Sequence, residues 1–391
     1  MFPTLQIRPG LHKRFIAGYP WLYANEIIQS NLTKESEPGQ LVLIEHQDKS
    51  IATGYFNRHS LISFRALSRL PEESIDVSFF KRRLLQALEL RNTFYTTPYY
   101  RLVHAEADNL PGLIIDRFDK VFVIQINTQG MEKLRDPLLQ ALQELFEPTT
   151  LYIKMDSKAR QQEGLPLTEP LIIGAPLTHL TVIENKTEFS VDISSSQKTG
   201  WFFDHQENRK MIAELSNQKR VIDYFCYSGG FSLQAAKQNA AYVIGVDGSE
   251  IALENARRSA TLNQISDRCE FICEDAFKDM DQRLQDKQIF DIVILDPPAF
   301  VKSKKDLPTG LKGYEKLLSK AIPLVAEHGF LMIASCSYHV KEADLQVCLA
   351  RALSKNNREG KIVRSLSAGP DHPLHPLLEE SRYLKGFLVS L

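Results

Sequence analysis

The stretch VIDYFCYSGGFSLQAAKQNAAYVIGVD, residues Val221–Asp247, indicates the fold of the C-terminal half of the chain. Val221–Phe225 and Tyr242–Val246 are apolar runs without strong alternation, typical of strands buried on both faces. Phe231–Gln238, between them, has helical spacing. Further strands are expected at Phe271–Cys273, Ile292–Leu295 and Phe330–Ala334, and further helices at Glu250–Leu262 and Lys312–Glu327. From about residue 186 the sequence therefore predicts a doubly wound, Rossmann-like parallel sheet of the α/β class.

The N-terminal part of the chain has a different pattern. Residues 1–72 contain short strand-like runs separated by turn residues, at Leu41–Glu45, Ser50–Phe56 and Leu61–Leu67. This pattern predicts a small β-barrel. Ser78–Leu90 carries apolar residues at helical spacing and is expected to be a connecting helix.

Residues 73–185 are expected to form an α+β domain that includes this helix. Leu113–Asp116 and Val121–Ile126 predict a hairpin, followed by a helix over Met131–Leu145 and a strand over Leu151–Met155. The β-β-α-β unit so formed precedes the α/β domain, which is expected over residues 186–391.

Length and composition exclude several classes of protein. With 391 residues the chain is long enough for two or three domains. Its composition, 43% hydrophobic and 24% charged, is that of a globular protein rather than a disordered, collagenous or coiled-coil one. The 47 basic and 48 acidic residues give a net charge of −1, so binding of nucleic acid would need a local basic patch.

Further features of the sequence favour a cytoplasmic protein. No apolar run approaches the ~20 residues of a membrane span, and the first residues lack the apolar region of a signal peptide. The five cysteines are odd in number and far apart, so no disulfide framework is expected. Cys269 and Cys273 have neither a second cysteine pair nor nearby histidines, so no metal site is expected.

The turn after Val221–Phe225 predicts a cofactor loop. Gly229 and Gly230 let the backbone approach a ligand at the carboxyl edge of the sheet. A dinucleotide fingerprint would need a third glycine where Leu233 stands, so the loop suits a ligand without pyrophosphate. Asp247 ends the next strand, where it can accept the ribose hydroxyls, and Asp275 follows the third strand, where it can accept the adenine amino group. This order favours S-adenosylmethionine over NAD, although a glycine pair alone is equally typical of a tight turn.

Two further strand ends carry candidate catalytic residues. Asp291–Phe300 reads DIVILDPPAF, so that a strand ends in Asp296 and a rigid Pro-Pro pair that can hold a planar base at the sheet edge. Cys336, flanked by two serines, lies where the following strand leaves the same edge. A thiolate there could add to C6 of a pyrimidine and make C5 nucleophilic. Burial of Cys336 as a small apolar side chain is the structural alternative.

These residues resemble the motif series of class I S-adenosylmethionine-dependent RNA methyltransferases. The resemblance lies in DYFCYSGGF, GVDGSEIALENARRSATLN, CEDAF, DIVILDPPAF and ASCSYH. Arg101–Phe118 and Ser196–Arg209 are similar to stretches of the bacterial ribosomal large-subunit methyltransferase I (RlmI-like) family, so the resemblance covers nearly the whole chain. It implies a PUA domain and an EEHEE-type domain before the methyltransferase domain.

The resemblance also implies a reaction, namely formation of 5-methylcytosine at one position of 23S ribosomal RNA. Cys336 would be the nucleophile, and Cys336 and Asp296 are the expected catalytic residues. The expected cofactor is S-adenosyl-L-methionine. The residues expected around it are Lys198, Thr199, Tyr227, Ser228, Gly229, Gly230, Asp247, Asp275, Asp296 and Pro297.

One departure from the wider RNA cytosine-C5 pattern concerns product release. Many such enzymes carry a second cysteine directly after the Pro-Pro pair, where this chain has Ala299. The base that removes the C5 proton is therefore open, with Asp296, Tyr338 and His339 as candidates. Ala299 also leaves a uracil-C5 reaction open, because enzymes of that class use a single cysteine in the corresponding strand.

RNA affinity should come from clustered basic residues, because phosphate neutralisation dominates binding. In the barrel these are Arg8, Lys13 and Arg14 near aromatic residues, together with Arg58, Arg65 and Arg69; Lys302, Lys304 and Lys305 follow the Pro-Pro pair. The residues expected to contact RNA are Arg8, Lys13, Arg14, Pro298, Phe300, Lys302 and Lys304. The expected partner is 23S ribosomal RNA, naked or in a partly assembled large subunit. Oligomeric state does not follow from the sequence, and a homodimer stays open.

Three other functions compete with pyrimidine-C5 methylation. An amino-group methyltransferase would use Asp296 and Phe300 to hold an exocyclic amine and would not need Cys336. A PUA-bearing RNA-binding protein with an inactive methyltransferase domain would not bind S-adenosylmethionine. A dinucleotide oxidoreductase is disfavoured by the missing third glycine.

Overall fold

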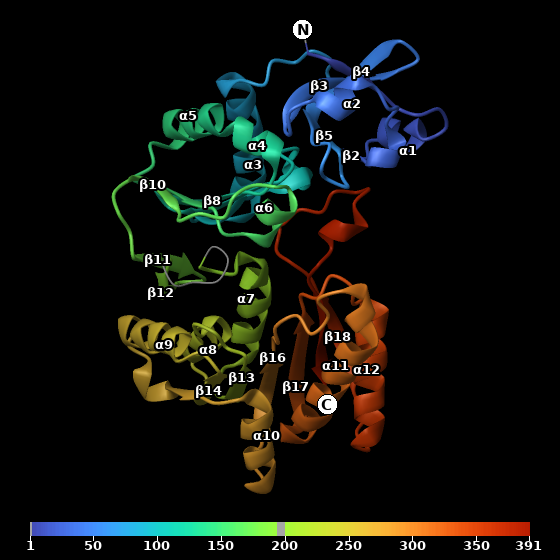
Figure 1. Cartoon of the computed structure of the whole chain (residues 1–391). Helices are drawn as coiled ribbons and strands as arrows, with labels where there is room; N and C mark the ends of the chain where they lie inside the picture. The colour runs from blue at the N-terminus through green and yellow to red at the C-terminus, as the bar shows by residue number, and fades with distance from the viewer. Residues whose placement is uncertain (1, 194–199) are drawn as a thin grey trace. The chain divides into compact units, whose positions relative to one another are not determined.

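The computed structural model describes residues 2–193 and 200–391, and it divides into two compact units (Figure 1). Of the described residues, the first unit comprises 2–178 and Pro370–Ser381, and the second comprises 179–193, Gly200–Gly369 and Arg382–Leu391. Each unit is described by itself. The domain boundaries expected near residues 72 and 185 stay a proposal.

The second unit is built on a seven-stranded sheet in the order β15-β14-β13-β16-β17-β19-β18. The strands are β13 (Arg220–Tyr224), β14 (Tyr242–Asp247), β15 (Cys269–Cys273), β16 (Phe290–Leu295), β17 (Val325–Ser335), β18 (Lys361–Leu366) and β19 (Lys385–Ser390). Pairs among the five predicted strands, β13–β17, are parallel as expected, whereas β19, which was not predicted, is antiparallel to both neighbours. The strand order reverses at β13, the place where α/β sheets bind their ligands.

Helices cover this sheet in two rows. One row is α7 (Gln206–Leu215), α8 (Gly230–Lys237) and α9 (Glu250–Leu262), and the other is α10 (Ala276–Gln285), α11 (Leu307–Ala321) and α12 (Glu342–Lys355). Right-handed crossovers on either side of the reversal place the two rows on opposite faces. Val293, Leu295, Tyr314, Leu317 and Ile333 are fully buried in the core between the sheet and α11. A hairpin of β11 (His179–Glu184) and β12 (Thr187–Asp192) precedes the sheet.

The first unit contains two further sheets. The barrel-like sheet has the order β1-β3-β4-β5-β2. Its strands are β1 (Thr4–Gln6), β2 (Trp21–Leu22), β3 (Gln40–His46), β4 (Lys49–Phe56) and β5 (Phe64–Ser68), with the short helices α1 (His12–Ile16) and α2 (Asn31–Glu35). Its apolar core includes Leu5, Phe15, Val42, Ile44 and Phe64.

The other sheet of this unit has the order β10-β9-β8-β7-β6. Its elements are β6 (Tyr99–His104), β7 (Leu113–Phe118), β8 (Val121–Ile126), β9 (Thr150–Lys154), β10 (Leu171–Gly174), α3 (Val77–Phe94), α4 (Gln129–Lys133), α5 (Arg135–Phe146) and α6 (Lys158–Gln162). Phe79, Leu84, Leu138 and Leu142 of α3 and α5 are buried against the sheet. The α+β class is confirmed, and β6 and β10 are additions to the predicted β-β-α-β unit.

Two predicted helices have wrong bounds. The helix expected over Met131–Leu145 is broken at Leu134, because Pro137 has no N–H to continue the hydrogen bonding of α4 into α5. The helix expected over Lys312–Glu327 ends at Ala321, and β17 begins at Val325. Pro323 lies in the single 3₁₀ turn between them.

The segment Pro370–Ser381 lies between β18 and β19 in sequence but belongs to the first unit. Asp371 is fully buried there, and its Oδ2 accepts a hydrogen bond from the backbone N–H of Arg101 at 2.9 Å. The Asp371 carbonyl accepts from Arg91, which also makes a two-bond ion pair with Asp108 at 2.6 and 2.8 Å. The buried Arg91 thus ties α3 to a segment translated almost three hundred residues later. No helix among residues 2–193 and 200–391 is long and apolar enough to cross a membrane.

Candidate active site at the carboxyl edge of the sheet

The five parallel strands β13–β17 end at one edge of the sheet. Tyr224 pairs with Leu295, and Leu295 pairs with Ile333, so Asp296 and Cys336 leave neighbouring strands at similar heights. On the other side of β13, Asp247 pairs with Cys273 at the ends of β14 and β15. The register therefore brings the predicted cofactor and catalytic residues to the same edge.

The loop after β13 has an unusual backbone. Phe225 and Tyr227 have φ values of 63° and 50°, and Gly229 has a φ of 77°. Non-glycine residues rarely adopt this left-handed conformation, and they often do so where a backbone is shaped for a ligand. A Cβ on Gly229 would lie 3.1 Å from that of Ala256, so this turn also needs glycine for close packing.

The two carboxylates that are predicted to bind the cofactor also accept hydrogen bonds from backbone N–H groups. Asp247 accepts hydrogen bonds from the N–H groups of Tyr227 (2.9 Å) and Ser249 (2.8 Å), which fixes the loop against the end of β14. Asp275 caps α10 by accepting from the N–H groups of Phe277 and Lys278, at 3.0 and 3.1 Å. Each carboxylate has further lone pairs for a ligand. Their assignment to ribose and adenine stays a prediction.

Asp223 is a site residue that the sequence analysis missed. It lies inside β13, fully buried, and its Oδ2 accepts from the N–H and the hydroxyl of Ser232 at 3.1 and 2.7 Å. Its Oδ1 has no hydrogen-bond partner among the described residues. Burial raises the pKa of Asp223 to about 7, and the nearby charges of Asp296 and Asp247 add to the shift. A buried oxygen without a partner is costly, so it marks a place where a ligand donor would be favourable.

His205 is the second missed residue. Its Nε2 lies 3.3 Å from Oδ2 of Asp296, and its Nδ1 lies 3.1 Å from the Asn208 amide nitrogen. The ring is buried and packs edge-on to Phe231 with centroids 5.4 Å apart. Burial disfavours charge on His205, but Asp296 outweighs it and raises the pKa of the imidazole. In the sequence, the one indication of His205 was its position inside Ser196–Arg209, a stretch that the sequence analysis cited only for its resemblance to the family.

Cys336 lies at the start of a loop held by hydroxyl groups. The Tyr314 hydroxyl lies 2.7 Å from the Ser335 hydroxyl and 3.0 Å from that of Ser337, and all three residues are buried. The Ser337 hydroxyl also accepts from the N–H of Val301, which links this loop to the segment after the Pro-Pro pair. Cys336 is only partly buried, whereas Ser335 and Ser337 are fully buried.

The Pro-Pro segment presents one face to solvent. Pro297 is buried and Pro298 is exposed, while the Phe300 ring packs on Tyr314 at 4.8 Å between centroids. Lys302 and Lys304 are exposed just beyond. Phe300 therefore supports the Cys336 loop through Tyr314, and Pro298 and the lysines are the accessible part of the predicted RNA contact.

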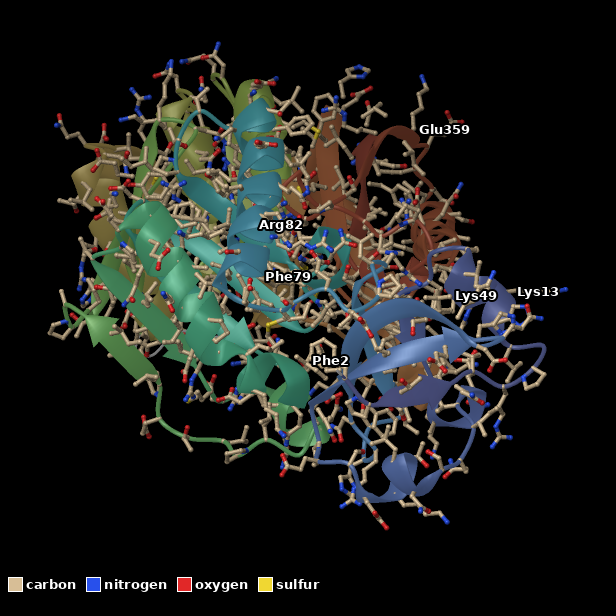
Figure 2. All side chains as sticks on the ribbon, turned by 90° about the horizontal axis from the view of Figure 1, so that it is seen from above. Phe2, Lys13, Lys49, Phe79, Arg82 and Glu359 are labelled. Atoms are coloured by element: carbon tan, nitrogen blue, oxygen red, sulfur yellow. The ribbon has the colours of Figure 1, made fainter. Side chains whose placement is uncertain are left out.

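The barrel carries the other predicted RNA contacts. Arg8 and Lys13 are exposed, and Figure 2 shows the Lys13 side chain extending away from the ribbon. The Arg14 guanidinium lies over the Tyr19 ring, 3.8 Å from its centroid. Arg65, expected on this surface, instead lies in internal ion pairs, 2.9 Å from Glu106 and 3.4 Å from Glu163.

Two predicted site residues cannot be placed. Lys198 and Thr199 lie outside the described residues.

Tyr227 packs edge-on to Phe202 with centroids 5.5 Å apart, and Ser228 is buried. In the described part of the chain, no cluster of three or more histidine, cysteine, aspartate or glutamate side chains is arranged to hold a metal ion.

Comparison with known proteins gives the family. A family model described as S-adenosylmethionine-dependent methyltransferase matches residues 165–360, and a PUA-like domain model matches residues 5–69. The ribosomal RNA large subunit methyltransferase I of Pseudoalteromonas atlantica is 33% identical over 396 residues, covering 100% of both chains. That of Escherichia coli O139:H28 is 32% identical over 393 residues, covering 99% of each chain. This chain belongs to the ribosomal RNA large subunit methyltransferase I family.

Solved structures agree on the fold of this family member. A protein from Streptococcus mutans, assigned as a SAM-dependent methyltransferase, superposes with a TM-score of 0.82 at 18% identity over 100% of both chains. A structure of a protein assigned as a methyltransferase, complexed with S-adenosylhomocysteine, superposes with a TM-score of 0.84 at 18% identity, also over 100% of both chains. The fold is a Rossmann-like methyltransferase fold with an N-terminal PUA-like domain.

The cofactor of the family, S-adenosylmethionine, fits the residues present. Asp223 offers a buried acceptor without a partner among the described residues, and the loop from Phe225 to Gly230 has the close-packed glycine and left-handed turns of a ligand cradle. Asp247 and Asp275 end β14 and follow β15 on one side of this loop, and Asp296 follows β16 on the other. Held at this edge, S-adenosylmethionine would supply an electrophilic methyl group.

Proposed function

We propose that the protein methylates C5 of a cytosine in the 23S RNA of the large ribosomal subunit, with Cys336 as nucleophile. The observation that carries this proposal is the position of Cys336. It leaves β17 partly exposed, at the edge to which Asp296 and the loop of Tyr227–Gly230 also belong. The relatives named ribosomal RNA large subunit methyltransferase I support the RNA substrate.

The chemistry requires a nucleophile because C5 of cytosine is itself unreactive. The Cys336 thiolate forms a bond to C6, and the electron pair of the C5–C6 double bond then forms the bond from C5 to the methyl group, while the methyl–sulfonium bond breaks. A base removes the C5 proton, and the bond between Sγ and C6 breaks to restore the double bond. Asp296, Tyr338 and His339 stay candidates for this base.

RNA contacts are proposed separately for each unit. In the barrel they are the exposed Arg8, Lys13 and Arg14, and beyond the Pro-Pro pair they are Lys302 and Lys304. Such side chains would neutralise phosphates, so binding should weaken as salt increases. Pro298 presents an exposed, rigid surface on which the target base can be held. A base in structured RNA must first be flipped out of its stack, at a cost of a few kcal/mol.

The deciding experiment is methyl transfer from radiolabelled S-adenosylmethionine to protein-free large-subunit RNA, followed by digestion to nucleosides. Wild type is expected to place label in 5-methylcytidine, and Cys336→Ala is expected to place none. Cys273→Ala is the matched control, because Cys273 is also a cysteine at a strand end of this sheet and is exposed. RNA carrying 5-fluorocytidine should trap a covalent adduct with wild type and not with Cys336→Ala.

Other outcomes would replace the proposal. Label in 5-methyluridine that disappears in Cys336→Ala would keep the mechanism and change the base. Label in an amino-methylated nucleoside that survives in Cys336→Ala would replace the mechanism. It would leave Cys336 as a packing residue.

A further inference from the structure

A buried lysine adjoins the loop of Cys336. Lys385 is the first residue of β19, where it pairs with Ser335, the residue before Cys336. The rest of this strand reads GFLVS, and Lys385 is its one charged residue, only 4% exposed. A charge taken out of water is costly unless it is paired, so its surroundings need an explanation.

The Lys385 ammonium closes the loop that follows Cys336. Its Nζ donates to the carbonyl groups of Ser337 and Val340, both at 2.7 Å, the short distance typical of charge-assisted hydrogen bonds. The N–H of Val340 donates to the same Ser337 carbonyl, so residues 337–340 form a turn. The carbonyl groups of its first and last residues both accept from Nζ. Among the described residues no carboxylate lies within ion-pair distance of this nitrogen.

The electrostatic surroundings of Lys385 come from three elements. Burial lowers the pKa of Lys385, whereas the charges of Cys336 at the end of β17 and of Asp344 on α12 raise it. Tyr314 of α11, which holds the flanking serines, also lies within range of the Cys336 charge. Lys385, which pairs with Ser335 and bonds to the Ser337 carbonyl, thus lies within electrostatic range of Cys336 between them, and a neighbouring lysine is a recognised cause of a low thiol pKa.

We propose that Lys385 is a positioning residue that keeps Cys336 ionised and holds its loop in shape for attack on the pyrimidine. The proposal deepens the proposed function, because it rests on Cys336 as nucleophile. Two hydrogen bonds to neutral carbonyls leave the positive charge of Lys385 without a paired carboxylate among the described residues. The thiolate can then supply the missing negative charge.

The test measures the ionisation of Cys336 in the full chain without RNA. The rate of carboxamidomethylation by iodoacetamide is followed between pH 5.5 and 10 for the peptide containing Cys336, by mass spectrometry. Lys385→Gln keeps a hydrogen-bond donor but not the charge, and Lys385→Met removes both. Both variants are expected to move the midpoint of the pH profile upward by at least about one pH unit. At pH values below both midpoints, this shift corresponds to a tenfold smaller thiolate fraction. The midpoint is the readout because thiolate nucleophilicity itself changes with pKa.

Matched variants control for the loss of a buried lysine and for folding. Lys154→Gln removes a lysine that is 6% exposed in the other unit, and it should leave the Cys336 midpoint unchanged. Lys385→Arg keeps the charge and should keep the midpoint near that of wild type. Thermal melting establishes that each variant is folded. If neither neutral variant folds, Lys385→Arg decides, because a midpoint about one unit or more above that of wild type would then overturn the proposal.

The outcomes separate this proposal from the proposed function. An unchanged midpoint in a folded Lys385→Gln variant would overturn it, as would a midpoint in Lys385→Arg that rises as far as in Lys385→Met. A shift in Lys385→Gln, with methylation lost in Cys336→Ala, supports both the proposal and the proposed function. A shift in Lys385→Gln while Cys336→Ala still methylates RNA would show that Lys385 ionises Cys336 and would overturn its part in attack on the pyrimidine together with the covalent mechanism.

Discussion

The buried carboxylate of Asp223 makes the stability of the protein depend on pH. Its pKa is raised to about 7 by burial, with the charges of Asp296 and Asp247 adding to the effect, against an ordinary value of 3.8. Between these two values the folded protein holds a proton that the unfolded chain has lost. Stability therefore falls as pH rises from about 4 to about 7 and then levels off.

Replacing Asp223 should remove this loss. Asp223→Asn keeps an oxygen for the two bonds from Ser232 but cannot ionise. It is expected to unfold at higher urea concentration than wild type at pH 8, and the gain should shrink toward pH 4. Asp275→Asn, at an exposed helix cap, serves as the control without such a gain. A gain that is the same at both pH values would contradict the explanation.

Asp247 should matter most for binding of the methyl donor. It fixes the N–H of Tyr227 and is the carboxylate assigned to the ribose. Asp247→Ala is expected to raise the dissociation constant of S-adenosylmethionine at least tenfold, about 1.4 kcal/mol, in a calorimetric titration. Asp247→Asn, which retains an acceptor, should lose less. Unchanged affinity in Asp247→Ala would refute the assignment.

The His205–Asp296 pair can be tested by titration. Burial alone would lower the pKa of His205, and Asp296 is the main group that raises it, with a smaller effect of the Asp204 charge. In Asp296→Asn the imidazole pKa is expected to fall below its ordinary value of 6.5, because burial remains while the charge is gone. Histidine NMR titration measures this, with Asp291→Asn at the opposite end of β16 as the control. An unchanged His205 pKa would show that another group sets it.

Strand ends explain which side chains the sequence could predict. Asp247, Asp275, Asp296 and Cys336 each follow or end an apolar run, and parallel strands bring such positions to one edge. His205 could not be found this way, because it comes from a short turn before α7 that no periodicity marks. Lys385 was missed because a charged residue at the start of an apolar strand usually faces solvent.

Secondary structure was predictable where apolar runs are long. Glu250–Leu262 is helical as expected, and β8 has the expected bounds. The largest errors in helix bounds lie at Leu134 and Ala321, where helical spacing in the sequence continues past the observed helix ends. Smaller errors are the helix predicted over Ser78–Leu90, which extends to Phe94, and the strand predicted over Leu61–Leu67, which begins at Phe64. The hairpin of β11 and β12 was not predicted, although the alternation of buried and exposed residues in β11 is typical of a strand.

Helix α4 depends on one glycine. A Cβ on Gly130 would lie 1.9 Å from the ring of Tyr55, a buried residue of β4 whose hydroxyl donates to the Pro111 carbonyl. Gly130→Ala is expected to lower the free energy of unfolding by about 1–3 kcal/mol, the usual cost of overpacking, measured by urea titration. Gly248→Ala is the control, since nothing lies within 4 Å of the added Cβ. Equal stability of the two variants would mean that Tyr55 can move aside.

The first unit is built from two distant parts of the chain, because residues 370–381 belong to it. Asp371 is buried among Tyr95, Arg101 and His372, and its carbonyl accepts from Arg91. A fragment of residues 1–178 is therefore expected to be less stable than the same part of the full chain. Adding a peptide of residues 369–382 should raise its melting temperature, and an Asp371→Ala peptide should raise it less. A fragment as stable alone as with the peptide would exclude this dependence.

The same segment sets an order of events during synthesis. The residues that surround Arg91 in the first unit leave the ribosome early, but Asp371 follows nearly two hundred residues after Thr178. At about 5–20 residues per second, that delay is on the order of 10–40 s. During this time Arg91 has its partner Asp108 but lacks the Asp371 carbonyl. Until residues 370–381 are synthesised, the nascent first unit therefore lacks these contacts, and we expect it to be more accessible to chaperones and proteases during this interval.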